Sequence, residues 1–238
     1  MNGLKIRWIG QSGYILSDGE TEICIDPYLS DIVNRIANRP RMVDAPFLPE
    51  ELKSDVVICT HNHLDHVDVD AIPLMSKDKM LFLAPKDAEE TLLECGVVNY
   101  KSFDKGTKVK IGDFELEAVY ADHTVPAVGV IVKHRGITMY FSGDTEYNER
   151  LEELKEYSID IMFICINGKL GNMNVDEAIK LTKTINPKVG VPTHYGMFES
   201  NTENPVNYTS KLDFGFIMEY NKTYSLSDIL GTTTGNEI

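Results

Sequence analysis

The sequence predicts an α/β fold in which two β-sheets are covered by helices. The first part of the chain contains β-forming runs joined by short turns, and the second half alternates between helical and extended patterns. Of its 238 residues, 42% are hydrophobic and 25% are charged, so the chain can bury a sizeable core and global disorder is excluded. No repeat or low-complexity linker divides it. We therefore expect one domain over residues 1–230 and a frayed polar tail at 231–238.

The strands of the first part are predicted from their turns. An Asp18-Gly19 pair separates β-rich runs at 13–17 and 21–25, and such a pair is a strong hairpin signal. Two further hairpins are expected, with turns at Gly112-Asp113 and at His134-Arg135-Gly136. Their strands are predicted at 108–111, 114–120, 128–133 and 137–142. Apolar runs at 55–59 and 79–84 are expected to form two more strands.

The helices are predicted from periodicity and capping residues. They are expected at 87–95, 148–157 and 175–185, with strands at 159–166 and 188–192. Asp87, with Glu90 three residues later, is the expected N-cap of the first helix. Asn174 and Glu177 resemble a capping box that opens the third helix. Asn186-Pro187 should end that helix, because a residue before proline disfavours the helical conformation.

The charge balance limits the classes of partner. There are 23 Lys and Arg against 37 Asp and Glu, a net charge of −14, which argues against nucleic acid and against an anionic membrane surface. A small anionic substrate stays open, because a bound cation can reverse the local field. The four cysteines lack C-x-x-C spacing and are expected to be buried and reduced. With no signal-peptide pattern and no membrane-length apolar run, we expect a cytoplasmic protein, and a homo-oligomer stays open.

Three of the six histidines fall within one short run, His61-Asn62-His63-Leu64-Asp65-His66, called here the histidine run. It follows the predicted strand at 55–59, and loops after strand ends commonly carry function in α/β folds. In an extended segment, residues two apart point the same way, so His61 and His63 can hold one cation. Asp65 and His66 then face a second position. A solvated polar loop is the alternative, but it gives no reason for crowding these groups.

Other candidates also follow predicted strands. His123 comes after the strand at 114–120, His194 after the strand at 188–192, and Asp144 after the strand at 137–142. Each of these residues alone is more typical of a structural histidine or a turn aspartate. Asp26 closes an early strand before Pro27. His134 sits in a predicted hairpin turn, and we expect it to be solvated and without a role.

Taken in order, H-x-H-x-D-H followed by His123, Asp144 and His194 resembles the metallo-β-lactamase superfamily, over nearly the whole chain. The resemblance implies a four-layer αββα sandwich with the site at the edge where two sheets meet. It implies that His61, His63 and His123 bind one metal ion, that Asp65, His66 and His194 bind a second, and that Asp144 bridges them. Asp26 would orient a ligand histidine, and Thr145 would lie in the layer of residues that hydrogen-bond around the metal ligands.

This ligand set predicts hydrolysis. Five neutral imidazoles and two carboxylates leave a positive centre when two divalent ions are bound, which attracts an anionic or electron-rich group. The ions, Zn²⁺ or Mn²⁺ with Fe²⁺ also acceptable to these ligands, would share a bridging hydroxide and polarise the attacked group. Asp65 would orient this nucleophile and transfer a proton. The redox branch of the superfamily is disfavoured, because its pattern has Glu where this chain has His63.

Several stretches resemble the L-ascorbate-6-phosphate lactonase branch, above all the loop at 166–174 and the residues after His194. The resemblance favours a small anionic lactone or related ester as substrate. A phosphodiesterase acting on a small or lipid phosphodiester is the alternative enzyme, and a non-catalytic metal-binding or sensor protein is the alternative of another class. The substrate-binding residues expected in these two stretches are Asn167, Asn172, Asn174 and Tyr195.

The segment at 31–49 carries three of the few arginines, Arg35, Arg39 and Arg41. Because the guanidinium fork suits phosphate and carboxylate, we expect the segment to cover the site and at least one of these arginines to bind the substrate. A solvated helix or a contact between subunits would explain the same segment.

Overall fold

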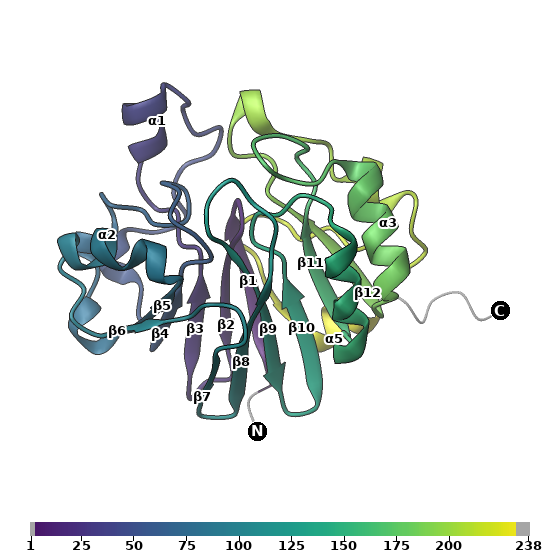
Figure 1. The fold of residues 1–238 in the computed structure, drawn as a ribbon, viewed down its shortest axis with the longest axis horizontal. Coiled ribbons are helices and arrows are strands. Elements are labelled where there is room, and N and C mark those ends of the chain that lie inside the picture. Colours follow the sequence, from purple (N-terminus) through teal and green to yellow (C-terminus); the bar gives the residue numbers. More distant parts are fainter. Residues whose placement is uncertain (1–2, 232–238) are drawn as a thin grey trace.

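The computed structural model describes residues 3–231, so the tail predicted at 231–238 lies, apart from Gly231, outside the described residues. Two sheets pack face to face, with helices on their outer sides (Figure 1). The predicted α/β sandwich is confirmed. In the part of the chain that is described, no helix is both long and apolar enough to cross a membrane.

The first sheet has seven strands. They are β1 (Lys5–Gly10), β2 (Gly13–Ser17), β3 (Glu22–Ile25), β4 (Val56–Ile58), β5 (Leu81–Ala84), β6 (Tyr100–Ser102) and β13 (Thr223–Ser225). Their order is β13-β1-β2-β3-β4-β5-β6. The β2–β3 hairpin is antiparallel as predicted, whereas β3, β4, β5 and β6 run parallel. The carboxyl ends of β3 and β4 therefore meet at the same edge.

The second sheet has six strands. They are β7 (Lys108–Ile111), β8 (Phe114–Tyr120), β9 (Val128–His134), β10 (Ile137–Phe141), β11 (Ile161–Cys165) and β12 (Val189–Thr193). Their order is β12-β11-β10-β9-β8-β7. Both predicted hairpins are confirmed, and β10, β11 and β12 run parallel. Because β8 and β10 both pair antiparallel with β9, they point the same way, and β8, β10 and β12 all end at one edge.

The helices are short, apart from α3. The α-helices are α1 (Ile32–Ala37), α2 (Glu89–Glu94), α3 (Val175–Ile185), α4 (Val206–Thr209) and α5 (Leu226–Leu230). The 3-10 helices are η1 (Pro49–Glu51), η2 (Ile72–Leu74), η3 (Lys77–Lys79), η4 (Lys86–Ala88), η5 (Glu149–Tyr157) and η6 (Glu199–Asn201). Figure 1 shows α2 and α3 on opposite outer sides of the sandwich, with α1 projecting above the strand ends.

One detail of the predicted helices is wrong. Asp87 does not cap α2: it lies inside η4, and the N-cap position belongs to Ala88, which makes no side-chain bond. The segment predicted as a helix at 148–157 is the 3-10 helix η5. The prediction for α3 is confirmed with its capping box, in which Asn174 accepts from the Glu177 N–H and the Glu177 carboxylate accepts from the Asn174 N–H.

The core follows from the alternation of side chains along the strands. In β3, Ile23 and Ile25 face the second sheet and join the large cluster between the sheets, while Cys24 faces the other way, into a cluster beneath α2. The main cluster includes stacked rings of Phe141 and Phe163, with centroids 4.3 Å apart. All four cysteines are free and buried, as predicted. This packing fixes the edge at which the strands end.

The prediction for His134 is wrong. Strand β9 extends to His134 itself, so the side chain is only 3% exposed and its ring packs on Phe114. Its Nε2 lies 3.1 Å from the carboxylate of Asp18, in the turn between β2 and β3. The charged neighbours Lys133 and Arg135 suggested a solvated turn, but the histidine instead links the turns of two sheets at the end opposite to the histidine run.

Replacing Asn174 by Ala should lower the free energy of unfolding by about 1 kcal/mol, because α3 loses its side-chain N-cap. Ser can also accept the N–H bond, so Asn174→Ser should retain most of the stability. Urea denaturation of the two variants beside the wild type measures both effects. Equal destabilisation by Ala and Ser would show that the cap contributes nothing.

Candidate metal centre

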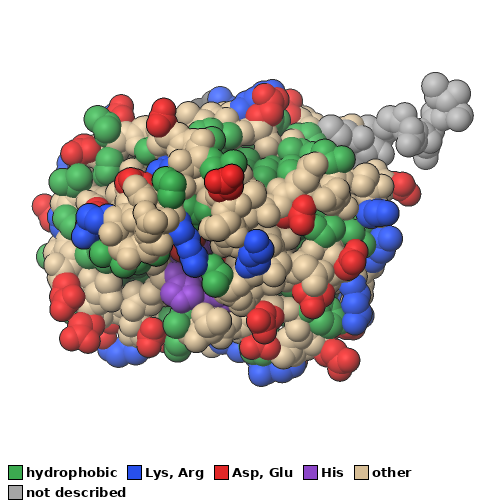
Figure 2. Space-filling view, turned by 90° about the horizontal axis from the view of Figure 1, so that it is seen from above, with side chains coloured by type: hydrophobic (Ala, Val, Ile, Leu, Met, Phe, Trp, Pro, Cys, Tyr) green, Lys and Arg blue, Asp and Glu red, His purple; other side chains and the backbone are tan. Residues whose placement is uncertain are grey.

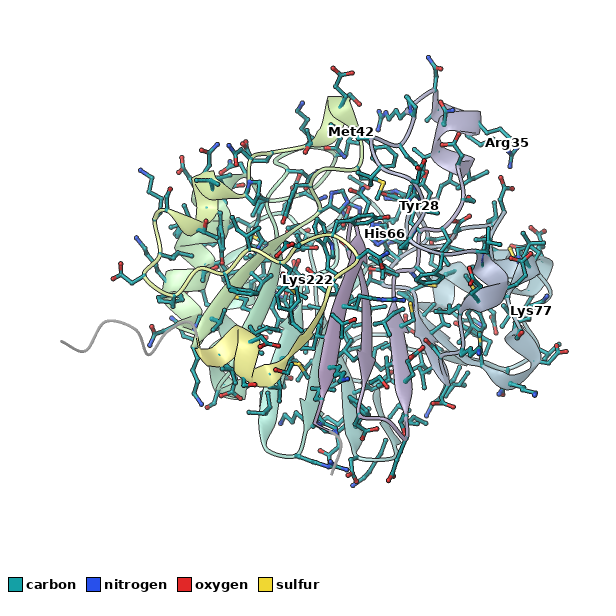
Figure 3. The ribbon with its side chains drawn as sticks, turned by 180° about the vertical axis from the view of Figure 1, so that it is seen from behind. Tyr28, Arg35, Met42, His66, Lys77 and Lys222 are labelled. Carbon is teal, nitrogen blue, oxygen red and sulfur yellow. The ribbon has the colours of Figure 1, made fainter. Side chains whose placement is uncertain are left out.

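The strand ends bring all seven predicted ligand side chains to one edge of the sandwich. The histidine run follows β4, and His123, Asp144 and His194 follow β8, β10 and β12. Hydrogen bonding joins the two sheets here, because the Val128 N–H donates to the Thr60 carbonyl and residue 61 forms a β-bridge with residue 127. In Figure 3, His66 lies at the upper ends of the strands.

Three histidines form the first group. The Nδ1 atom of His63 lies 3.0 Å from Nε2 of His61 and 3.2 Å from Nε2 of His123. One ring nitrogen from each residue therefore lies within reach of a single ion. This is the trio implied by the superfamily resemblance.

The second group is formed by Asp65, His66 and His194, with Asp144 between the two groups. The carboxylate of Asp144 lies 3.3 Å from Nε2 of His66, 3.2 Å from Nε2 of His194 and 4.0 Å from Nε2 of His123. Asp65 Oδ2 lies 3.7 Å from His194 Nε2 and 3.9 Å from His66 Nε2. Asp144 thus contacts residues of both groups, as a bridging carboxylate must.

The donor atoms fit divalent cations. The Nε2 atom of His66 is buried without a hydrogen-bond partner although it faces the cluster, and imidazole and carboxylate together suit Zn²⁺, Mn²⁺ or Fe²⁺. Burial, assisted by neighbouring imidazoles, lowers the pKa of His61 well below its usual value. The ring is therefore neutral at neutral pH and has a lone pair to offer.

The carboxylates also require positive charge at this position. Burial lowers the pKa of His66, but the carboxylates of Asp26, Asp144 and Asp65 outweigh it and raise the pKa well above its usual value. Burial raises the pKa of Asp144, yet His194 and His66 hold it well below its usual range. Buried anions need a compensating cation, and a metal ion can supply that charge in place of the imidazole proton.

Asp26, predicted to orient a ligand histidine, contacts His66. Its carboxylate lies 2.9 Å from Nδ1 of His66 and accepts hydrogen bonds from both the N–H and the hydroxyl of Thr60. Asp26 has a left-handed backbone with φ of 44°, and its N–H donates to the Ile58 carbonyl at the end of β4. This arrangement fixes the face of His66 that points at Asp144.

The hydroxyl of Thr145 makes no hydrogen bond to a predicted ligand among the described residues, although Thr145 follows Asp144 in the chain. Its hydroxyl accepts the N–H of Asp122, so it holds the segment that carries His123. The Nδ1 atom of His123 in turn lies 2.8 Å from the Gly171 carbonyl, which selects Nε2 as the atom facing the centre.

Beside the centre lies a pocket with a volume of about 330 Å³. Its polar lining includes His63, Asp65, Asp144 and His194, and its apolar lining includes Val33, Leu64, Leu170 and Phe198. Figure 2 shows histidine side chains reaching the surface near the middle of this face, with basic side chains next to them. The volume suits a small molecule.

Comparison with known proteins agrees with this geometry. The beta-lactamase superfamily domain matches residues 5–194. The chain belongs to the metallo-β-lactamase superfamily. It is 26% identical, over 90% of its length and 92% of the relative's, to a UPF0173 metal-dependent hydrolase of Methanosarcina mazei.

Solved structures show the same fold. A metallo hydrolase of Ignicoccus hospitalis has a TM-score of 0.75 at 22% identity, covering 94% of this chain and 98% of the other. The metallo-β-lactamase fold protein YhfI of Bacillus subtilis has a TM-score of 0.72 at 17% identity, covering 93% and 99%. The predicted fold is confirmed, and so is the predicted class of enzyme, a metal-dependent hydrolase.

Of the three arginines predicted from the segment at 31–49, only Arg39 lines the pocket. Arg35 pairs with Asp70 on the outer side of α1, away from His66 (Figure 3). Arg41 donates to the backbone carbonyls of Tyr28, Ser30 and Val43, and stacks on the Tyr28 ring. Val33 and Arg39 are the two residues of the segment at 31–49 that line the pocket, and the prediction that the segment covers the site stays a prediction.

The predicted substrate residues after β11 and β12 have other contacts. Asn172 donates to Asp144 Oδ2 at 2.9 Å, Asn167 donates to Asn201, and Asn174 caps α3. Tyr195 packs on Trp8 and lines a separate apolar hollow. None of these four is among the residues that line the pocket at the centre. Asn172 contacts a predicted ligand, and the structure gives the others packing or capping contacts.

Gln11 was missed by the sequence analysis. It lies fully buried in the turn between β1 and β2, with a left-handed φ of 49°. Its Nε2 donates to Asp65 Oδ2 at 2.8 Å, and its carbonyl accepts from Trp8, Thr193 and the His194 N–H. Sequence spacing gives no sign of this link. The only local signal is a polar residue between two apolar strands, in Gly10-Gln11-Ser12-Gly13.

Asp26→Asn should weaken divalent-ion binding by about 10- to 100-fold, because the charge that orients His66 is lost. Competition with a chromogenic chelator measures the affinity. Asp213→Asn is the matched control, since it removes the same charge from an exposed turn and, among the described residues, belongs to none of the groups that could hold a metal ion. Equal affinity in the two variants would contradict the role given to Asp26.

Proposed function

We propose that this metal-dependent hydrolase cleaves a small anionic lactone or related ester at a centre of two divalent ions. The observation that carries the proposal is that Arg39 lines the same small pocket as four of the seven candidate ligands, His63, Asp65, Asp144 and His194. His61, His63 and His123 would hold one ion, Asp65, His66 and His194 the other, and Asp144 both. When bound, such ions lower the pKa of water towards about 7 and polarise the attacked carbonyl.

Asp65 is the proposed proton carrier. Gln11 fixes one of its carboxylate oxygens, and the side chain remains 18% exposed on the pocket side, so it can meet an attacking water. It would take the proton of that water and deliver it to the leaving alkoxide, which a lactone or ester releases on cleavage. The buried contact with Gln11 keeps the carboxylate in one orientation through both transfers.

Arg39 is the proposed anion-binding residue. Among the described residues it is half-buried and makes no hydrogen bond or ion pair that would occupy its guanidinium, whereas Arg35 and Arg41 are both engaged. A guanidinium presents two N–H groups that match the oxygens of a carboxylate or phosphate. It would bind the anionic group of the substrate while the scissile bond lies at the ions.

The size of the pocket favours a small substrate over a lipid phosphodiester. A volume of about 330 Å³ lies at the low end for small-molecule sites. The net charge of −14 also disfavours attraction of a polyanion to the surface.

A substrate panel tests the proposed function. Protein loaded with Mn²⁺ or Zn²⁺ should hydrolyse paraconate, a γ-lactone with one ring carboxylate, and should lose this activity when a chelator is added. Turnover of bis-p-nitrophenyl phosphate without turnover of any lactone would replace the proposal by a phosphodiesterase. Absence of turnover of either class, with metal bound, would replace it by a non-catalytic metal-binding protein.

Arg39→Met should raise KM for paraconate by about tenfold or more and leave kcat nearly unchanged, because a charge-assisted bond to the substrate is lost in ground state and transition state alike. KM for the uncharged γ-butyrolactone should stay the same. Arg35→Met is the control, since that arginine pairs with Asp70 outside the pocket. If both variants raised KM equally, Arg39 would have no specific role.

A further inference from the structure

The loop at 167–174 is held rigidly next to the metal centre. The Gly168 N–H donates to the Met173 carbonyl, and the Met173 N–H donates to the Thr145 carbonyl. The ammonium of Lys169 donates to the Ser200 carbonyl, and Asn167 donates to Asn201. These contacts fix the loop against η6 and against the segment after β10.

Leu170 lies in this loop with an unusual backbone and an unusual exposure. Its φ is 57°, in the left-handed region that a leucine rarely adopts, and its side chain is 54% exposed. The next residue, Gly171, presents its carbonyl to His123 and could not carry a Cβ, which would lie 2.7 Å from the His123 ring. The contacts of its neighbours Lys169 and Gly171 thus fix the backbone on both sides of Leu170. Such backbone strain is found preferentially at functional sites and ligand clamps.

The side chain of Leu170 is exposed into the pocket. It lines the same pocket as Val33, Leu64 and Phe198. Val33 and Phe198 belong to a small separate core with Tyr28, Ile32 and Met197, and Leu64 of the histidine run packs against it. The pocket therefore combines four apolar side chains with four candidate ligands and a single arginine.

We infer that Leu170, Leu64, Val33 and Phe198 form an apolar subsite that binds a hydrocarbon group of the substrate. The substrate class that fits is an amphipathic one, in which one molecule carries an anionic group for Arg39, a scissile lactone or ester, and a short alkyl or aryl substituent. The inference rests on the proposed function for the nature of the scissile bond. The binding of a hydrocarbon group is inferred from the residues that line the pocket and does not depend on that function.

Binding of non-hydrolysable ligands tests the subsite without turnover. Calorimetry with metal-loaded protein and succinate, methylsuccinate, propylsuccinate and pentylsuccinate should show affinity rising about threefold for each added methylene up to propyl. Leu170→Asn keeps a residue that tolerates the left-handed backbone but removes the apolar side chain. In this variant, the gain in binding affinity per methylene, on a logarithmic scale, should be less than half that of the wild type.

Leu93→Asn is the matched control, because Leu93 on α2 is equally exposed, at 53%, and lies outside the pocket. It should keep the wild-type dependence on chain length. If affinity did not rise with chain length in the wild type, or if both variants behaved alike, the subsite would be ruled out.

Turnover of paraconate and its ring-alkyl derivatives separates this inference from the proposed function. In the wild type, kcat/KM should rise by the same factor of about three per methylene, or about 25-fold from paraconate to the propyl derivative, and Leu170→Asn should reduce the gain per methylene to less than half on a logarithmic scale. A rise in alkylsuccinate affinity without hydrolysis of any lactone would preserve the subsite and overturn the lactonase proposal. Hydrolysis at a rate independent of the alkyl group would preserve the lactonase proposal and overturn the apolar subsite.

Discussion

The carboxylate of Asp26 is the contact on which the rest of the centre depends. It accepts two hydrogen bonds from Thr60 and lies against Nδ1 of His66, so the histidine run is fixed to the end of β3. The carbonyl of the same Thr60 accepts a hydrogen bond from the N–H of Val128 in the second sheet. One buried anion thereby sets the orientation of a candidate ligand and lies next to the hydrogen bond that joins the sheets at this edge. Its burial is tolerable only because donors and positive charge surround it.

Strand direction explains why residues far apart in the chain converge. His123, Asp144 and His194 each follow a strand that ends at the same edge, opposite the histidine run. This convergence could be predicted, because position after a strand is visible in the sequence and the superfamily resemblance supplies the pairing. Gln11 could not be predicted, since its contact with Asp65 spans 54 positions and depends on how the β1–β2 turn packs. His134 was misplaced because charged neighbours do not reveal that its own side chain points to the buried carboxylate of Asp18.

Residue type alone also did not distinguish side chains that line the pocket from side chains that stabilise the loops around it. The three arginines of the segment at 31–49 look equivalent in the sequence, yet Arg41 binds carbonyls of its own segment and Arg35 pairs on the outer surface. Likewise Asn174, in the loop that most resembles a substrate loop, caps a helix, while Asn172 supports Asp144. The residue of this loop that lines the pocket is instead Leu170, whose backbone conformation no sequence pattern indicates. The pocket that results combines a charge-dense centre, one cation and an apolar wall, so each part of a small substrate would meet a different kind of surface.

The proposed centre holds two ions through seven side chains, with Asp144 between the ions. Anomalous scattering from crystals of the metal-loaded protein tests this arrangement most directly. Two peaks per chain are expected, one bound by His61, His63 and His123 and one by Asp65, His66 and His194, with the carboxylate of Asp144 contacting both. A single peak, or ions held by other residues, would contradict it.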